Sequence, residues 1–281
     1  MSSPDRARLD RRTWSTCTYG LGMSTQRASR RPRVIVSSTA SLDGRITFSR
    51  QQRLLNPDVA QRWQSHWPPD VPELMALRRA DIEDRHHPPV VMEGSGTFVA
   101  DSAGPVMGIP GQHDASDLRR DWLPKRSQRW FAVVDGRGRV PWSFTADSDA
   151  RLLVLVCART PLPYLAWLRA LGAPYLVAGE SRVDLSVALE KMQGLLRARC
   201  VVSEGGGGIN GALLRAGLVD ELQMIWFPTV IGGAGTPSSF DGDPLTPGQA
   251  PRAMTHRGTV IGRHGSIWSR YESTIDRDGP L

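Results

Sequence analysis

The chain has 281 residues, of which 40% are hydrophobic and 22% are charged, and its formal net charge is +7. This composition fits a globular protein of one large or two modest domains. The longest wholly apolar stretch, residues 152–158, is far shorter than the roughly 20 residues that a membrane span requires, so we expect no membrane partner.

The positive charge is concentrated at the amino end of the chain. Residues 1–33 contain eight arginines and two aspartates, a net charge of +6, whereas residues 34–281 carry only +1. We therefore expect residues 1–32 to be a basic, disordered tail, with RNA or DNA binding through this segment as an alternative. Arg11 and Arg12 precede a stretch that is too polar for an export signal and lacks a cleavage pattern.

From Arg33 onward, segments typical of strands alternate with segments typical of helices, which is the pattern of βα units. In the first half we expect strands at 33–38, 89–92 and 130–134, and a helical region over 57–81 that Pro68 and Pro69 interrupt. Residues 101–129 are polar and rich in glycine and proline. They are predicted to form a long loop, and loops of that length are usually functional or mobile.

The second half is more regular. We expect strands at 152–157, 175–178, 200–203 and 221–227 and helices at 161–171 and 210–216. The apolar residues from Leu185 to Leu196 fall on one helical face, and Asp184 precedes them as an N-cap. His264 and Gly265 separate two strand-like runs, which predicts an antiparallel hairpin. These elements indicate one α/β domain over residues 33–275, with a mostly parallel central sheet flanked by helices, and a short tail at 276–281.

The strongest local feature is a glycine run between the strand at 200–203 and the following helix. Backbone N–H groups in such a run can approach a phosphate at the positive end of a helix. The run lacks the lysine of a P-loop and the spacing of a Rossmann fingerprint, and a plain tight turn is the alternative. Its residues are Glu204, Gly205, Gly206, Gly207, Gly208, Ile209 and Asn210.

A second glycine turn follows the strand at 89–92 and leads to Asp101. It consists of Gly94, Ser95, Gly96 and Thr97. Two such turns after strands of one parallel sheet lie at the same carboxyl edge, where open α/β sheets bind ligands. A long anionic cofactor such as a dinucleotide could use both.

A third turn, from Ser41 through Asp43 and Gly44 to Arg45, follows the first strand. Taken alone it is a capped turn, since Asp-Gly is common turn chemistry. The three turns nevertheless occur in the order found in the pyrimidine reductases of riboflavin biosynthesis, which the chain resembles over about residues 33–275. The resemblance also rests on Ala-Gly-Leu-Val-Asp-Glu-Leu at 216–222 and Pro-Thr-Val-Ile-Gly-Gly at 228–233. It implies a dihydrofolate-reductase-like fold and a homodimer.

This resemblance implies an NADPH-dependent reductase. Members of the family reduce the ribosyl group of a ribosylaminopyrimidine 5′-phosphate, a phosphorylated heterocyclic molecule, to a ribityl chain. Hydride passes from the nicotinamide to C1′ of an opened imine form of the sugar. The cofactor would be held by Thr39, Gly94, Ser95, Gly96, Thr97 and Asp101, and by Gly205, Gly206, Gly207, Gly208, Ile209 and Asn210, with residues 206–212 around its diphosphate.

The same resemblance implies Glu204 and Asp43 as catalytic residues and Ser41, Arg78 and Glu204 as substrate-binding residues. Asp43 and Ser41 would lie at the floor of the cleft. Arg78 would meet the substrate phosphate, a task that suits a planar guanidinium. Glu204 would handle a proton or orient the substrate. The alternative for Glu204 is a carboxylate that accepts hydrogen bonds from the N–H groups of the glycine turn.

Three departures from the family pattern keep other functions open. Ser37 stands where many members have Lys or Asn, no arginine follows Asp101 at the family's position, and Glu93 places a negative charge beside a glycine turn. One alternative is a divergent paralogue that reduces a different heterocycle in specialised metabolism. A second is a non-catalytic nucleotide-binding or assembly protein.

Cysteines and histidines give no indication of a metal site. Cys17, Cys157 and Cys200 show no paired spacing, so neither a disulfide framework nor a cysteine-based zinc site is supported. The zinc motif of the deaminase domain that many bifunctional riboflavin enzymes carry is also missing. We therefore expect a reductase alone, without a metal, in the cytoplasm.

Overall fold

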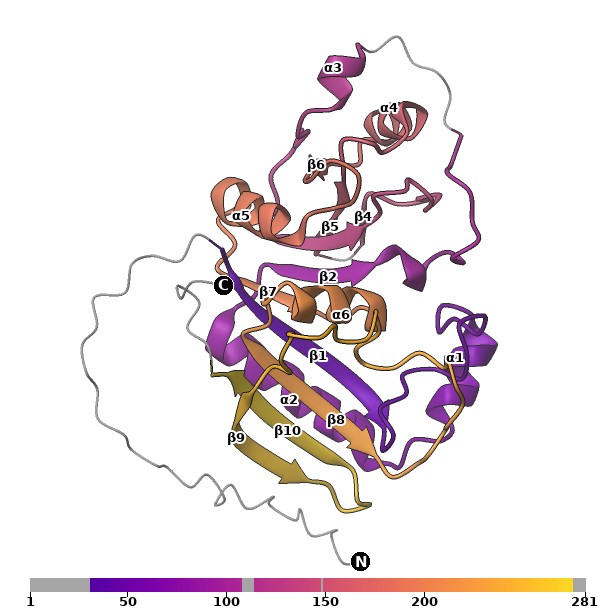
Figure 1. Ribbon diagram of the computed structural model, residues 1–281, viewed down its shortest axis with the longest axis vertical. Coiled ribbons are helices and arrows are strands. Elements are labelled where there is room, and N and C mark those ends of the chain that lie inside the picture. The colour runs from indigo at the N-terminus through magenta and orange to yellow at the C-terminus, as the bar shows by residue number, and fades with distance from the viewer. Residues whose placement is uncertain (1–30, 108–113, 148, 275–281) are drawn as a thin grey trace, which may run out of the picture.

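A central sheet organises the part of the chain that the computed structural model describes, residues 31–107, 114–147 and 149–274. Within that part the sheet has ten strands, in the order β4-β5-β3-β2-β7-β1-β8-β10-β9 with β6 beside β5 (Figure 1). The strands are β1 (Arg33–Ser41), β2 (Val90–Gly94), β3 (Arg129–Val134), β4 (Ala146–Asp147), β5 (Ala150–Val156), β6 (Tyr175–Val177), β7 (Cys200–Ser203), β8 (Glu221–Phe227), β9 (Met254–Ile261) and β10 (Ile267–Ser273).

Most neighbouring strands run parallel. Only β4 and the carboxyl-terminal hairpin of β9 and β10 pair in the antiparallel sense within the described residues. The predicted α/β class, with a mostly parallel sheet and a terminal antiparallel hairpin, is confirmed.

Helices lie on both faces of the sheet. They are α1 (Pro57–Gln64), α2 (Asp70–His86), α3 (Ala115–Leu118), α4 (Leu162–Leu171), α5 (Leu185–Leu196) and α6 (Gly207–Arg215), with a 3-10 turn, η1 (Ser95–Thr97). Side chains of α5 and α6 share one core cluster with β2 and β7. On the opposite face, α2 packs on β8 and β10 and α4 packs on β3 and β5.

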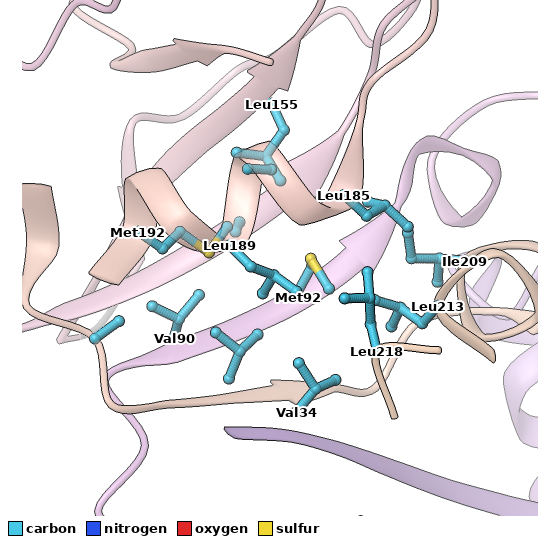
Figure 2. Packing of buried hydrophobic residues seen from close by; sticks show 14 of the residues in the cluster. Val34, Val90, Met92, Leu155, Leu185, Leu189, Met192, Ile209, Leu213 and Leu218 are labelled. Atoms are coloured by element: carbon cyan, nitrogen blue, oxygen red, sulfur yellow. The ribbon is translucent and has the colours of Figure 1, made fainter. Parts of the chain in front are cut away.

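The alternation of side chains along β2 separates this core from the opposite face. Val90 and Met92 point into the core, where Figure 2 shows them beside Leu189 and Met192 of α5, with Leu213 of α6 nearby. Because successive side chains of a strand point to opposite faces, Val91 and Glu93 lie on the other side. A single strand thus contributes both to the core and to the surface opposite.

That opposite surface has a strip without a helix over it. Leu74 of α2 contacts Ile225 and Trp268 at one end of the sheet, while α4 covers β3 and β5 at the other end. Ile82 of α2 reaches as far as β7, where it packs on Cys200 and Val202, and β2 is the next strand between β7 and β3 in the sheet order. The half-buried Val91 of β2 therefore lines an open cleft, which the buried Val202 of β7 and Ile82 of α2 border on one side.

The elements agree with the expected pattern, with local differences. Strands β7 and β8 span the predicted residues, but α6 begins at Gly207 instead of Asn210. Glycine has low helix propensity, so the sequence pattern misses a first turn that packing stabilises. Residues 101–129 are also not a plain loop, because they include α3 and the bridge between Trp122 and Tyr175.

The basic amino-terminal segment is only partly described. Residues 1–30 and 275–281, which hold most of both predicted tails, lie outside the described residues. Arg31 pairs with Asp220 at 2.7 Å, and Arg33 pairs with Glu221 at 2.8 Å and Glu272 at 2.9 Å. Two of the eight arginines therefore neutralise carboxylates of the folded body.

Among the described residues, no helix combines the length and apolar character needed to cross a membrane.

Candidate active site

The cleft over the uncovered strip has a volume of about 1990 Å³. It begins near Pro88 and Arg129, where β2 and β3 start, and extends to the two glycine turns at their carboxyl ends. Most of the residues expected to bind a cofactor or substrate line it. They are Thr39, Arg78, Gly94, Ser95, Gly96, Thr97, Asp101, Glu204, Gly205, Gly206, Gly207, Gly208 and Ile209.

The glycine run combines two kinds of position. A β-carbon on Gly205 would lie 2.5 Å from the Cα of Glu93, and one on Gly207 would lie 2.1 Å from the carbonyl oxygen of Ser238. Packing within the chain therefore requires glycine at both. Gly206 and Gly208, in contrast, have no atom within 4 Å of such a β-carbon. Both line the cleft, so the space that their missing side chains leave is available to a ligand.

The amino end of α6 supplies hydrogen-bond donors to the same place. Its N-cap is Gly206, and no side chain in the described part of the chain caps the helix. The first N–H groups of a helix have no partner within the helix and carry a partial positive charge. A phosphate at this end would receive both the hydrogen bonds and the favourable electrostatic interaction.

Charge and polarity of the lining also suit an anionic ligand. The hydroxyl oxygen of Thr39 is buried and has no hydrogen-bond partner among the described residues. Such a group costs free energy unless something binds it. Lining arginines outnumber lining carboxylates. The arginines are Arg50, Arg53, Arg78, Arg79, Arg129, Arg137, Arg139 and Arg182, and the carboxylates are Glu83, Glu93, Asp101, Asp149, Glu204 and Asp241.

Arg78 of α2 brings a buried positive charge into the cleft. Its side chain is 7% exposed, and its Nη1 donates a hydrogen bond to the carbonyl oxygen of Ser38 at 2.6 Å. Burial lowers its pKa to about 10, against the attraction of Glu204, which raises it. The guanidinium is therefore still charged at neutral pH and is positioned to bind an anionic group.

Glu204 follows β7 at the edge of the cleft. Its N–H donates to the carbonyl oxygen of Met92 at 3.1 Å, and its side chain is exposed. Within the described residues its carboxylate accepts no hydrogen bond from the glycine turn. The interpretation of Glu204 as a residue that only satisfies that turn is therefore not what the structure favours.

Asp43 and Ser41 lie outside the lining of the cleft. Asp43 accepts hydrogen bonds from the hydroxyl of Ser41 at 2.6 Å and from the N–H groups of Ile231 at 3.1 Å and Gly232 at 2.7 Å. These bonds, that of Ser41 first, hold the pKa of its carboxyl well below the usual range. The contacts support a role in fixing the 228–236 segment. A catalytic role for Asp43 and substrate binding by Ser41 remain predictions.

The side chain of Asn210 also points away from the cleft. Its amide oxygen accepts from the hydroxyl of Ser203 at 2.7 Å, and its Nδ2 donates to the carbonyl oxygen of Ser239 at 3.0 Å. Both bonds are buried and tie α6 to β7 and to the segment after β8. Direct contact between this side chain and a cofactor thus remains a prediction without support from its geometry.

Arg139 is a cleft residue that the sequence interpretation missed. Its guanidinium donates to the carbonyl oxygens of Ala100 and Asp101, at 2.9 and 3.1 Å, and to the hydroxyl of Ser95 at 3.1 Å. It therefore holds the glycine turn at residues 94–97 in place. The only signal was its position, a few residues after the strand at 130–134, where a loop of a parallel sheet reaches the ligand edge.

Rim residues come from separate connecting segments. Arg50 lies 3.5 Å from Asp241 and 3.9 Å from Asp101, while Arg137 lies 3.9 Å from Asp101.

Among the described residues, no three or more His, Cys, Asp or Glu side chains gather in a group able to hold a metal ion.

Comparisons with known proteins agree with this geometry. The family model described as "RibD C-terminal domain" matches residues 32–260. The chain is 31% identical over 215 residues to the 2,5-diamino-6-ribosylamino-4(3H)-pyrimidinone 5′-phosphate reductase of Archaeoglobus fulgidus, covering 76% of this chain and 88% of that protein. It is 28% identical over 218 residues to the reductase of the same name from Methanothermobacter thermautotrophicus, covering 76% and 85%.

Solved structures share the fold at lower identity. A pyrimidine reductase-like protein from Corynebacterium diphtheriae superimposes with a TM-score of 0.58 at 17% identity, covering 87% of this chain and 93% of that one. RibD from Acinetobacter baumannii superimposes with a TM-score of 0.54 at 20% identity, covering 88% of this chain and 59% of that one. At these identities the structural likeness speaks for the fold.

Proposed function

The chain belongs to the RibD C-terminal domain family, and on that basis we propose that it reduces a ribosylaminopyrimidine 5′-phosphate with NADPH. Membership makes it a pyrimidine reductase, an oxidoreductase that uses a reduced nicotinamide cofactor. The choice of NADPH and of this substrate is the proposal. When bound, the cofactor supplies a hydride to C1′ of the opened imine form of the sugar.

One observation carries the cofactor part of the proposal. Gly206 and Gly208 leave open space in the cleft beside an uncapped helix end. A diphosphate would fit there, and the unpartnered hydroxyl of Thr39 would face the same ligand. The protein then has to orient two rings and exclude water. The hydride transfer itself requires no further reactive group of the protein.

The substrate part rests on Arg78 and Glu204. A buried guanidinium makes strong, directional hydrogen bonds with a phosphate. Arg78 is also close enough to Glu204 for each charge to act on the other. We propose that Arg78 binds the 5′-phosphate and that the exposed carboxylate of Glu204 orients the polar groups of the substrate.

Cofactor binding is tested by a fluorescence titration with NADPH and, in parallel, NADH. We expect the wild-type protein to bind NADPH at sub-millimolar concentration, and we expect Gly208→Val to weaken binding at least about tenfold, because the branched side chain fills the space for the diphosphate. Titration of both proteins under the same buffer conditions gives the comparison.

Gly194→Val is the matched control for this variant. Gly194 is another helical glycine with open space around it, but it lies on α5 and does not line the cleft. Its replacement should leave NADPH binding unchanged. A wild-type protein that does not bind NADPH would overturn the proposal. NADPH binding without reduction of any ribosylaminopyrimidine phosphate would instead favour a divergent or non-catalytic paralogue.

We also propose that the protein is a homodimer. In the described part of the chain, β9 is an edge strand, and its terminal Ile261 is 72% exposed. An unpaired edge with an exposed apolar side chain is a surface that a second copy can cover. Light scattering should then give about twice the chain mass of 30.9 kDa. A mass of one chain at micromolar concentration would refute the dimer.

A further inference from the structure

Two glutamates lie at adjacent positions in the lining of the cleft. Strands β2 and β7 pair in parallel, with Met92 opposite Ser203 as the last registered pair. Glu93 of β2 and Glu204, which directly follows β7, are the next residues along the chain, and both line the cleft. The backbones are close at this point, because a β-carbon on Gly205 would lie 2.5 Å from the Cα of Glu93.

The surroundings of the two carboxylates differ. Glu204 is exposed and is attracted by Arg78. Glu93 is largely buried, and this burial raises its pKa, the charge of Glu204 raises it further, and a hydrogen bond with Thr97 opposes the change. Two ionised carboxylates at adjacent positions repel one another, so one of them tends to hold a proton.

No cation offsets the charge of Glu93 within the described residues. The groups that face it are the carboxylate of Glu204 at the end of β7 and the hydroxyl of Thr97 in η1. The nearby first turn of α6 contributes only Gly207, Gly208 and Ile209, none of which titrates. Arg78 of α2 acts on Glu204. Burial and the neighbouring carboxylate of Glu204 therefore both favour the protonated form of Glu93.

We propose that Glu93 is a catalytic acid that donates the proton of the reduction, while the exposed side chain of Glu204 orients the substrate. This role rests on the proposed function. Hydride adds to C1′ of the imine, and the electron pair of the C=N double bond moves to the nitrogen. That nitrogen takes the proton from the Glu93 carboxyl, which leaves a carbon–nitrogen single bond, an N–H group and a Glu93 carboxylate. Solvent returns a proton to Glu93 after the product leaves.

The arrangement follows a general rule of acid–base catalysis. When neighbouring titratable groups have environments that separate their pKa values, the group with the raised pKa serves as the acid. A residue that can keep its proton near neutral pH and lies beside the substrate is an effective donor. The sequence alone suggested that Glu93, beside the glycine turn, would oppose binding of an anionic cofactor. The proposed acid role gives this side chain a function at that position.

Glu93→Gln tests this role, since it keeps the shape of the side chain and removes the transferable proton. We expect single-turnover reduction to slow by about 10²-fold or more, with NADPH affinity changed by less than about twofold. In the wild type the rate should fall as pH rises through the pKa of Glu93, and the variant should lose this fall. Glu93→Asp should restore part of the rate and of the pH dependence.

An infrared difference spectrum provides a readout without turnover. The carbonyl band of a protonated carboxyl should be present in the wild type near neutral pH and missing from Glu93→Gln. Glu190→Gln, at an exposed position on α5, should leave both the band and the rate unchanged. A Glu93→Gln rate and pH profile equal to wild type would overturn the role and leave the proposed function standing. A wild type that binds NADPH but reduces no such substrate would overturn both.

Discussion

Glu221→Ala is expected to lower the free energy of unfolding by about 3–5 kcal/mol, as for other buried ion-pair partners. Glu221 is 0% exposed at the start of β8. It accepts hydrogen bonds from Arg33 at 2.8 Å, from Gln223 at 2.8 Å and from Arg85. Its removal leaves two partly buried guanidinium groups without their shared partner. Urea denaturation of wild type and variant measures the difference.

The same carboxylate should make the protein sensitive to acid. Burial alone would raise the pKa of Glu221, but the hydrogen bonds and charges of Arg85 and the charge of Arg33 outweigh it and lower the pKa from 4.5 to about 2. A lowered folded-state pKa stabilises the protein above pH 4.5, and this contribution is lost as pH falls from there toward 2. Over that pH interval, protonation of Glu221 should lower the free energy of unfolding of the wild type by about 3 kcal/mol. Glu221→Gln should not show this loss.

Glu272→Gln is the matched control for the buried carboxylate. Glu272 also pairs with Arg33, at 2.9 Å, but it is 27% exposed. Water reaches and screens this partly exposed ion pair, so Glu272→Gln should lower the free energy of unfolding by less than about 1 kcal/mol. If Glu221→Gln and Glu272→Gln lowered the free energy of unfolding equally, the larger contribution of the buried Glu221 would be contradicted.

Arg78→Met is expected to lower kcat/KM for the phosphorylated substrate by about 10- to 150-fold, the equivalent of one charge-assisted hydrogen bond of roughly 1.5–3 kcal/mol. Stability should change by no more than about 1 kcal/mol, because the variant removes one hydrogen bond to Ser38 but also removes a buried charge. Steady-state kinetics and thermal unfolding of the same preparation separate the two effects.

The dephosphorylated substrate distinguishes phosphate binding from a general defect. If Arg78 binds the phosphate, wild type and Arg78→Met should reduce the dephosphorylated compound at similar rates. Arg126→Met, at an exposed position outside the lining of the cleft, should match wild type with both compounds. Unchanged kcat/KM together with a large loss of stability would show that Arg78 serves only the fold.

Sequence patterns predicted the regular parts of the fold well where burial dominates. The apolar run at 221–227 becomes β8 with the same bounds, and Asp184 caps α5 by accepting from the N–H groups of Ser186 and Val187. The pattern missed β4, which has only two residues, and the first turn of α6, which consists of glycines. The first turn of α6 packs on residues 238–241, which are distant in sequence, and local propensity does not include such contacts. Strand β4 pairs with the adjacent β5 but is too short to show an alternating pattern.

Prediction of the site succeeded for backbone features and was weaker for side chains. The two glycine turns could be recognised because strand, glycine and helix follow one another along the chain. The position of Asp43 depends on Ile231 and Gly232, almost 190 residues away in sequence. The pairing of Glu93 with Glu204 depends on the register of β2 and β7. One sequence feature does point to this proximity. Each glutamate lies two residues after an apolar residue of its strand, and such positions share one face of the sheet.

The floor of the cleft and the core share the same strands. Along β2, Val90 and Met92 pack against α5, whereas Val91 and Glu93 face the cleft. A change in the strand backbone would therefore disturb both sides, so these positions have little tolerance for substitution. Arg50, Arg137 and Arg182 at the rim are exposed and belong to connecting segments. We therefore expect substitutions that change substrate preference to be tolerated at the rim better than on the floor of the cleft.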